Sequence, residues 1–343
     1  MTPSLDAPSF VARTNGDGSK FSLTRPPRPM LARDADSMYW MSRYIERAEH
    51  VARILLVNSN VLIDVGDLDE ELQELQWESI LTIMHLHGGP PGEGPLPARV
   101  PRYMAFDQDN PSSLYTCIAR ARENARGIRE TISTEMWENL NTLYWSIRGD
   151  DAAVRFDESP DDFYKHVMTS SMLFQGLTDQ TMAHDQRWLF AQLAKYLERI
   201  DVTARLLQTK YDILRDADLE TPIRNIHWMA MLRSCCSIEA YRRQHIGDMD
   251  PLRVASFLIL EPEYPRSIRF AVTKAHEAIG CIRAEVNPRS IDAAERVLGR
   301  LRAQLDYAEI GEILADGLPA YLQKIQNDAI EAAVALQKGY FLH

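Results

Sequence analysis

The chain has 343 residues, of which 45% are hydrophobic and 25% are charged, which is the ordinary balance of a folded globular protein. Its net charge of −11 argues against a general nucleic-acid-binding protein and favours protein or small-molecule partners. Because no apolar run approaches the roughly 20 residues of a membrane span and no secretory signal opens the sequence, we expect a cytoplasmic protein without membrane contact.

The first 30 residues are rich in proline and small polar residues and show no apolar periodicity. We expect residues 1–30 to form a disordered arm, or an arm that becomes ordered only against a partner. From residue 31 onward, apolar side chains recur at helical spacing, and Asp36 or Ser37 is suited to cap the N-terminus of that helix. The folded body is therefore predicted to begin near residue 31.

Helical patterns continue along the rest of the chain. Acidic residues between 67 and 71 suit the positive end of a helix dipole, and apolar periodicity follows them. The segment GGPPGEGPLPARVP, residues 88–101, is predicted to be a loop because of its glycines and prolines. Helical spacing resumes after Asn110, and alternating strand patterns are almost absent. The sequence therefore predicts an all-α fold.

An internal repeat is the most informative feature. Two segments lie 152 residues apart (196 − 44), and the first set of residues matches the second in order: Tyr44, Glu46, Arg47, Ala52 and Arg53 against Tyr196, Glu198, Arg199, Ala204 and Arg205. Two further landmarks follow at nearly the same spacing: Trp77 and Leu81 match Trp228 and Leu232, and Pro111 and Ser113 match Pro265 and Ser267. We expect an internally duplicated helical bundle whose repeats of about 150 residues, 31–182 and 183–343, pack as one body.

The repeated residues share one ridge of a helix. At 100° per residue, Glu46, Glu49, His50 and Arg53 fall together beside the apolar stripe. The second copy places Glu198, Asp201 and Arg205 in the same way. Since the flanking residues are apolar, Glu46 and Glu198 are predicted near a helix contact, where a carboxylate must be paired or hydrogen-bonded.

Three interpretations of this ridge stay open. The first is a buried Glu–Arg lattice that ties the two repeats together. The second is a site in which Arg47, Arg53, Arg199 and Arg205 hold a carboxylate or phosphate. The third is a metal site built from Glu46, Glu49, His50, Glu198 and Asp201, as in helical di-iron proteins, although Val202 occupies the position where a second histidine is needed.

Cysteines and tryptophans are interpreted as structural. Cys117, Cys235, Cys236 and Cys281 lie in apolar helical contexts without a metal-binding spacing, so we expect reduced core residues. The tryptophans fall on apolar helical faces and are expected to anchor the core: Trp40, Trp77, Trp137, Trp145, Trp188 and Trp228.

The segments LARDADSMYWMSRYIERAEHVARIL, YLERIDVTARLL and NPSSLYTCIARARENARGIRE together resemble the bacterial alpha-E family, which is named for its Glu-Arg motif. By position, the motif residues are Glu46 and Arg47, with Glu198 and Arg199 as their counterparts. The resemblance implies an association with circularly permuted ATP-grasp amide-bond ligases and transglutaminase-like proteases. It also implies a role in making or modifying a peptide.

Together with this resemblance, the repeated polar ridge and the absence of a self-sufficient catalytic signature lead us to expect a non-catalytic partner or scaffold subunit of the ATP-grasp-type ligase system that the resemblance implies, with no cofactor of its own. The ligase, its peptide or an amino-acid substrate is expected to bind a face that includes Tyr44, Glu46, Arg47, Glu49, Arg53, Tyr196, Glu198, Arg199, Asp201 and Arg205. One alternative is a helical enzyme, with or without a carboxylate-bound metal, that modifies a peptide or amide. Another is a purely structural assembly protein.

Overall fold

The computed structural model describes residues 30–65, 70–86, 88–149, 151–216, 221–245, 247, 249–285 and 291–341, and all of its regular elements are helices. The predicted N-terminal arm lies outside these residues, apart from Met30. In chain order the helices are α1 (Ala32–Val65), α2 (Glu70–Ile83), α3 (Leu96–Phe106), α4 (Leu114–Gly127), η1 (Arg129–Thr131), α5 (Thr134–Arg148), α6 (Ala152–Glu158), α7 (Pro160–Thr181), α8 (Gln186–Asp216), α9 (Thr221–Ser234), α10 (Ile238–Gln244), α11 (Pro251–Leu260), α12 (Ile268–Glu285), α13 (Asp292–Asp306), α14 (Ile310–Asp316), α15 (Leu318–Leu336) and η3 (Gln337–Phe341).

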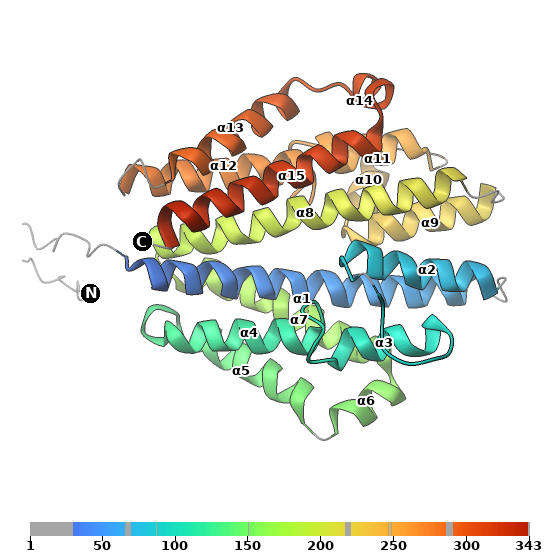
Figure 1. Ribbon diagram of the computed structural model, residues 1–343, viewed down its shortest axis with the longest axis horizontal. Helices are drawn as coiled ribbons and strands as arrows, with labels where there is room; N and C mark the ends of the chain where they lie inside the picture. The colour runs from blue at the N-terminus through green and yellow to red at the C-terminus, as the bar shows by residue number, and fades with distance from the viewer. Residues whose placement is uncertain are drawn as a thin grey trace, which may run out of the picture.

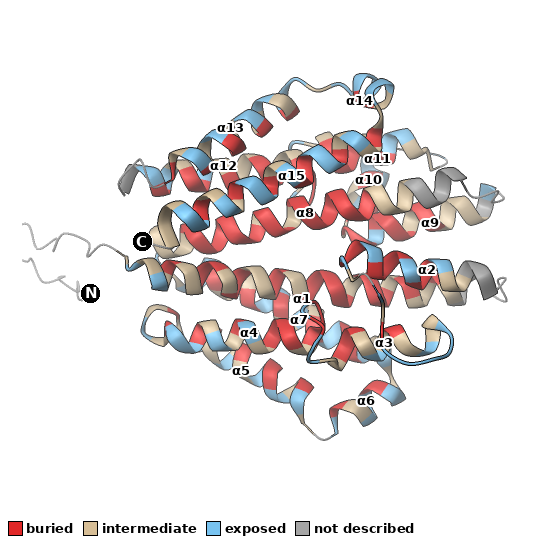
Figure 2. Ribbon diagram, viewed as in Figure 1, coloured by how far each residue is buried: buried red, intermediate tan, exposed pale blue. Residues whose placement is uncertain are grey.

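Two long helices, α1 and α8, lie side by side along the middle of the molecule (Figure 1). Helices α4 and α7 pack against α1 on one side, and α12 and α15 pack against α8 on the other. At one end the packing crosses over, because α2 contacts α8 and α9 contacts α1. Figure 2 shows that the buried residues concentrate on α1 and α8, so most of the core is built around this central pair.

The first helix begins earlier than predicted. Its first residue is Ala32, whereas Asp36 and Ser37 lie inside the helix. Ala35 is fully buried, and the backbone N–H groups of Asp34 and Ala35 already donate to the carbonyl of Leu31. Burial of an additional turn therefore moves the helix start upstream of the residues that are best suited to cap it.

The predicted loop at residues 88–101 is correct only in its first half. Helix α3 begins at Leu96 with proline in its first turn, where the missing N–H costs nothing. The N–H of Leu96 donates to the Glu74 carboxylate at 3.0 Å, so a side chain of α2 satisfies this helix end. The prediction failed because the capping group is remote in sequence.

Two structural expectations need correction. Trp145 is 52% exposed, and its ring lies under the guanidiniums of Arg122 and Arg148 instead of in the core. Cys281 is exposed because Ile279 and Ile282 turn the buried face of α12 away from it. Cys236 is only partly buried, whereas Cys117 and Cys235 are core residues. Trp77 and Trp228 are buried, and Trp40, Trp137 and Trp188 pack at the edge of the core.

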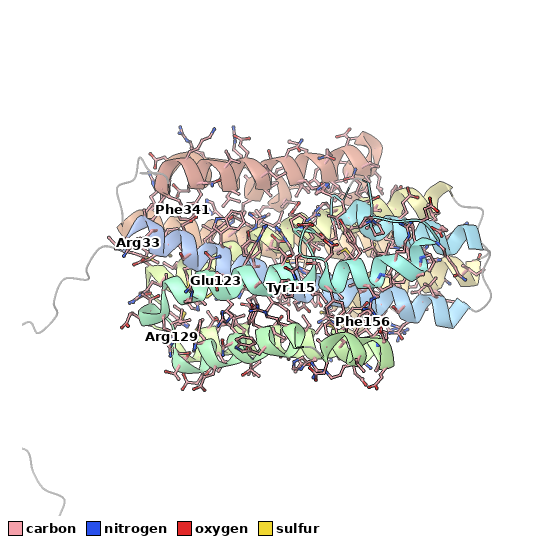
Figure 3. All side chains as sticks on the ribbon, turned by 60° about the horizontal axis from the view of Figure 1, so that its bottom comes forward. Arg33, Tyr115, Glu123, Arg129, Phe156 and Phe341 are labelled. Carbon is pink, nitrogen blue, oxygen red and sulfur yellow. The ribbon has the colours of Figure 1, made fainter. Side chains whose placement is uncertain are left out.

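The C-terminal turn closes one end of the bundle. Phe341 of η3 lies 5.5 Å from the ring of Tyr39 on α1 and 5.7 Å from the ring of Phe190 on α8. Figure 3 shows Phe341 next to the start of α1, near Arg33. The two ends of the described chain therefore meet beside the central helices. Among the described helices, none has the length and apolar character required to cross a membrane.

Candidate functional site

The Glu–Arg pairs of α1 and α8 meet where the two helices touch. Glu198 of α8 is fully buried, and its two oxygens accept from the guanidinium of Arg47 at 2.6 and 3.0 Å. Arg43, one turn earlier on α1, donates to the same carboxylate at 2.7 Å. The carboxylate of Glu198 is thus held by two arginines from the opposite helix, in the bidentate geometry that guanidinium favours.

The reverse pair lies beside it. Glu46 of α1 is 1% exposed and accepts from Arg199 of α8 at 2.6 and 3.3 Å. Gln175 of α7 adds a third donor at 3.3 Å. Each central helix therefore contributes one acid and the adjacent base, and each base reaches the acid of the other helix. We call Glu46, Arg47, Glu198 and Arg199 the cross-helix lattice.

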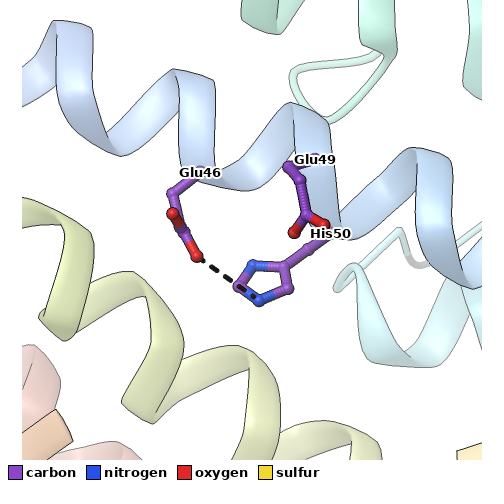
Figure 4. A group of neighbouring side chains, drawn as sticks. All are labelled: Glu46, Glu49 and His50. Atoms are coloured by element: carbon purple, nitrogen blue, oxygen red, sulfur yellow. Dashed lines mark ion pairs between the residues drawn. The ribbon is translucent and has the colours of Figure 1, made fainter. Parts of the chain in front are cut away.

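A second layer of charge continues along α1. Glu49 accepts from Arg53, one turn away, at 2.7 Å, and from Arg266 at 2.8 Å. Arg266 also lies 2.7 Å from Nε2 of His50, which makes Nε2 an acceptor and places the imidazole proton on Nδ1. His50 Nδ1 is buried and has no partner. Figure 4 shows Glu46, Glu49 and His50 converging below α1.

The predicted pair on α8 forms as well. Arg205 donates to the Asp201 carboxylate at 3.2 and 2.8 Å, and it also donates to the carbonyl of Ile83 at the end of α2. Both side chains are largely buried. Asp201 and Arg205 therefore fasten α2 to α8 and lie apart from the Glu46 group.

Electrostatics keep these carboxylates ionised. Burial alone raises the pKa of a carboxyl group, but the guanidiniums of Arg47 and Arg43 outweigh it, so the pKa of Glu198 falls below its ordinary value. For Glu49, Arg266 outweighs burial in the same way and lowers the pKa to about 2. His50 behaves in the opposite sense, because burial and the charge of Arg266 both lower its pKa, to about 4. At neutral pH the site contains ionised pairs around an uncharged imidazole.

The metal interpretation finds some of its ligands together. One atom each from Glu46, Glu49 and His50 lie within 4.8 Å of one another, and all three residues are buried. Glu198 and Asp201 do not belong to this group, so the five predicted ligands do not converge among the described residues. The guanidiniums of Arg53, Arg199 and Arg266 already hold the two carboxylates, and a cation would have to compete with them.

The tyrosines of the repeated segments lie at the rim of the lattice. The Tyr44 ring has the guanidiniums of Arg47 and Arg120 over it, at 5.9 and 5.8 Å. Tyr196 stands likewise beside Arg199, at 5.6 Å, and beside Lys195, at 4.8 Å. Both rings are only partly buried, as are Arg47 and Arg199 beside them, so this edge of the lattice reaches the surface.

An open hollow of about 500 Å³ adjoins Tyr44. Helices α1 and α4 line it with Ser37, Trp40, Tyr44, Ala119, Arg120, Glu123 and Asn124. Figure 3 labels Glu123 and Tyr115, two turns apart on α4; Tyr115 lines a different hollow, beside α3. The hollow beside Tyr44 offers two aromatic rings, an arginine and a glutamate to solvent.

Sequence reasoning missed several participants. Arg43 lies one turn before Arg47, and its helical spacing was a usable signal. Arg266 had no such signal, since it lies in the turn before α12 and reaches Glu49 from 217 residues away. The sequence pattern did not predict Gln175 or the buried Lys195 either. Their positions depend on how α7, α8 and α12 pack, which the local pattern does not contain.

The chain belongs to the Alpha-E family, which is described as a predicted alpha-helical domain with a conserved ER motif, and the match covers residues 30–341. Similar curated proteins include uncharacterized proteins of Mycobacterium bovis and of two strains of Mycobacterium tuberculosis, each 23% identical over 317 residues. Each alignment covers 84% of this chain and 34% of the relative, so the chain spans about a third of those proteins' length. No solved structure matches.

Proposed function

We propose that the chain is a non-catalytic partner or scaffold subunit of an ATP-grasp-type amide-bond ligase system that builds or modifies a peptide. Membership of the Alpha-E family supports this proposal. So does the length of the mycobacterial relatives, because a segment that accounts for about a third of a longer protein is expected to work beside other domains. A transglutaminase-like protease is a second partner of the same system.

The observation that carries the proposal is the internal pairing of the cross-helix lattice. Glu46 and Glu198 are each held by arginines, so the motif has no uncompensated carboxylate to offer as a catalytic base. Because separation of the two helices would leave buried charges unpaired, the lattice holds α1 against α8. That contact presents a rigid rim of Tyr44 and Arg120 to the hollow, where the ligase, its peptide or an amino acid binds.

We also propose that the fold is an internal duplication about an approximate two-fold axis. Ser113 caps α4 and donates to the Asp107 carbonyl at 2.5 Å, and Ser267 does the same before α12 with the carbonyl of Glu261. His85 and Cys236, 151 residues apart (236 − 85), both have φ of 55°, and among the described residues they are the non-glycine residues with positive φ. Corresponding turns with matching strain support a common origin of the two halves.

Co-expression with the ATP-grasp-type ligase of the same genome tests the function. The tagged ligase is expected to capture the wild-type chain, and Arg120→Glu in the hollow is expected to weaken capture. Arg300→Glu is the matched control, since it makes the same change of charge at an exposed arginine of α13, outside the hollow. Failure of the wild-type chain to bind the ligase, or amide formation by the purified chain alone with ATP, contradicts the proposal.

A further inference from the structure

A small cavity lies away from the cross-helix lattice, among helices α1, α2, α8 and α9. Its volume is about 20 Å³, which is room for one water molecule or one ion of similar size. Its polar lining comes from Asn58, Gln76, Lys210 and His227, one from each of the four helices, and from Ser234. The rest of the lining is apolar, so the polar groups have little else to contact.

The polar atoms that face this cavity are mainly hydrogen-bond donors. The ammonium of Lys210 donates to Oε1 of Gln76 at 2.7 Å and to Oγ of Ser79 at 3.0 Å. These contacts use two of its three N–H groups. Because Oε1 faces Lys210, the free end of the Gln76 amide is its NH2 group. Nε2 of Gln76, Nδ2 of Asn58 and Nε2 of His227 are all buried without a partner.

The three side chains with unpartnered atoms are themselves almost inaccessible. Gln76 is 1% exposed, His227 is 2% exposed and Asn58 is 6% exposed. A buried donor without an acceptor is costly, and native proteins rarely tolerate several in one place. The arrangement therefore calls for an acceptor inside the cavity.

Lys210 brings a positive charge to the cavity. No carboxylate occurs among its lining residues. Burial lowers the pKa of Lys210 to about 8, so the amine is still mainly protonated at neutral pH. Burial and the charge of Lys210 also lower the pKa of His227 to about 4, which keeps that imidazole neutral, with one donor and one acceptor nitrogen. A protonated amine that shares the cavity with the unpartnered NH2 groups of Gln76 and Asn58 attracts an anion.

We propose that this cavity binds a single monatomic anion of the halide class, for which chloride is the available ligand. The size excludes phosphate, sulfate and carboxylates. A water molecule fits, but it accepts only two hydrogen bonds and brings no charge, so it leaves donors unsatisfied and the ammonium unpaired. A halide accepts several hydrogen bonds and also brings the negative charge.

The positions of the lining residues in the sequence bear on why the cavity has one lysine and not two. Lys210 lies 152 residues after Asn58 (210 − 58), and His227 lies 151 residues after Gln76 (227 − 76). If the proposed duplication holds, these are corresponding positions, and the cavity lies on the axis that relates the halves. Because only Lys210 of the pair Asn58 and Lys210 is charged, the cavity has one ammonium group, which one monovalent anion neutralises.

Bromide tests the site in the wild-type chain. Crystals of the full chain grown in sodium bromide are expected to show an anomalous peak in the cavity, in contact with Lys210 and Gln76. A peak at water level, without anomalous signal, contradicts the proposal. This experiment requires no variant, and its outcome is independent of whether a ligase binds.

Thermal unfolding provides the second test. The midpoint Tm is expected to rise saturably with chloride or bromide at constant ionic strength, with gluconate replacing the halide, because a ligand that binds only the folded state stabilises it. Lys210→Met is expected to abolish this halide-specific shift. Lys165→Met, which removes the same charge from an exposed position, is expected to retain it. A shift that is equal in gluconate, or that survives in Lys210→Met, overturns the site.

Discussion

Arg47 of α1 and Glu198 of α8 form a bidentate ion pair across the centre of the molecule, and their immediate neighbours in the chain form the same pair in the opposite direction. This reciprocity neutralises charge on both helices and fixes their relative register, since a slide of either helix breaks both pairs together. A buried pair of this kind does not have to add net stability over an apolar contact, but the loss of one partner is expensive.

Removal of one acid is therefore predicted to be severe. Glu198→Gln leaves the partly buried Arg43 and Arg47 around a neutral amide, and we expect it to lower the free energy of unfolding by about 3–5 kcal/mol. Denaturant unfolding followed by circular dichroism measures this change. Glu123→Gln is the matched control, because its pair with Arg126 is exposed and is expected to contribute less than about 1 kcal/mol. Equal effects of the two substitutions would show that the central pair has no special role.

Stability is predicted to fall in mild acid, through His50. The unfolded imidazole takes up its proton near pH 6.5, whereas the folded one resists until about pH 4, so the unfolded state binds more protons between these values. The contribution of His50 to the free energy of unfolding is therefore complete above pH 6.5, and it declines by up to about 3 kcal/mol as the pH falls to 4. His227 contributes over the same range, for the same reason.

The difference between the wild-type chain and His50→Gln isolates the contribution of His50. We expect the variant to show a shallower loss of stability between pH 6.5 and 4. Below pH 4.5 both proteins are expected to lose further stability, because the depressed pKa of Glu49, about 2, makes protonation of this carboxylate unfavourable to the fold. Identical slopes in the two proteins above pH 4.5 would refute the assignment to His50.

Metal content separates the scaffold from the enzyme alternative. Since guanidiniums already hold Glu46 and Glu49, we expect purified protein to contain iron or manganese well below one ion per chain, and chelation by EDTA to leave Tm unchanged. Elemental analysis by mass spectrometry gives the content. Stoichiometric metal that disappears in Glu46→Ala would instead establish a metal centre at Glu46, Glu49 and His50.

Much of the arrangement follows from sequence periodicity. Apolar spacing predicts the helices, and the helical wheel places Glu46, Glu49 and Arg53 on one ridge beside a helix contact. The i, i+4 pairs Glu49–Arg53 and Asp201–Arg205 form as expected. These features depend only on residues within one helix, which is why a local pattern is sufficient to predict them.

Features that need a remote partner were not predictable in this way. The choice of Arg47 for Glu198, and not for Glu46 beside it, depends on how α1 lies against α8. The start of α3 depends on Glu74, 22 residues earlier. Arg266 enters the site from a turn, and Ser112 stands 154 residues before it (266 − 112), so no repeated arginine in the sequence points to it.

A double-mutant cycle tests the central relationship most directly. Denaturant unfolding compares the variants Arg47→Met and Glu198→Gln with the double variant. The interaction energy is the difference between the effect of the double variant and the sum of the two single effects. We expect a coupling of about 2–3 kcal/mol, because each single change strands the partner's buried polar group. Additive effects, within about 0.5 kcal/mol, would contradict the cross-helix lattice as the element that joins α1 to α8.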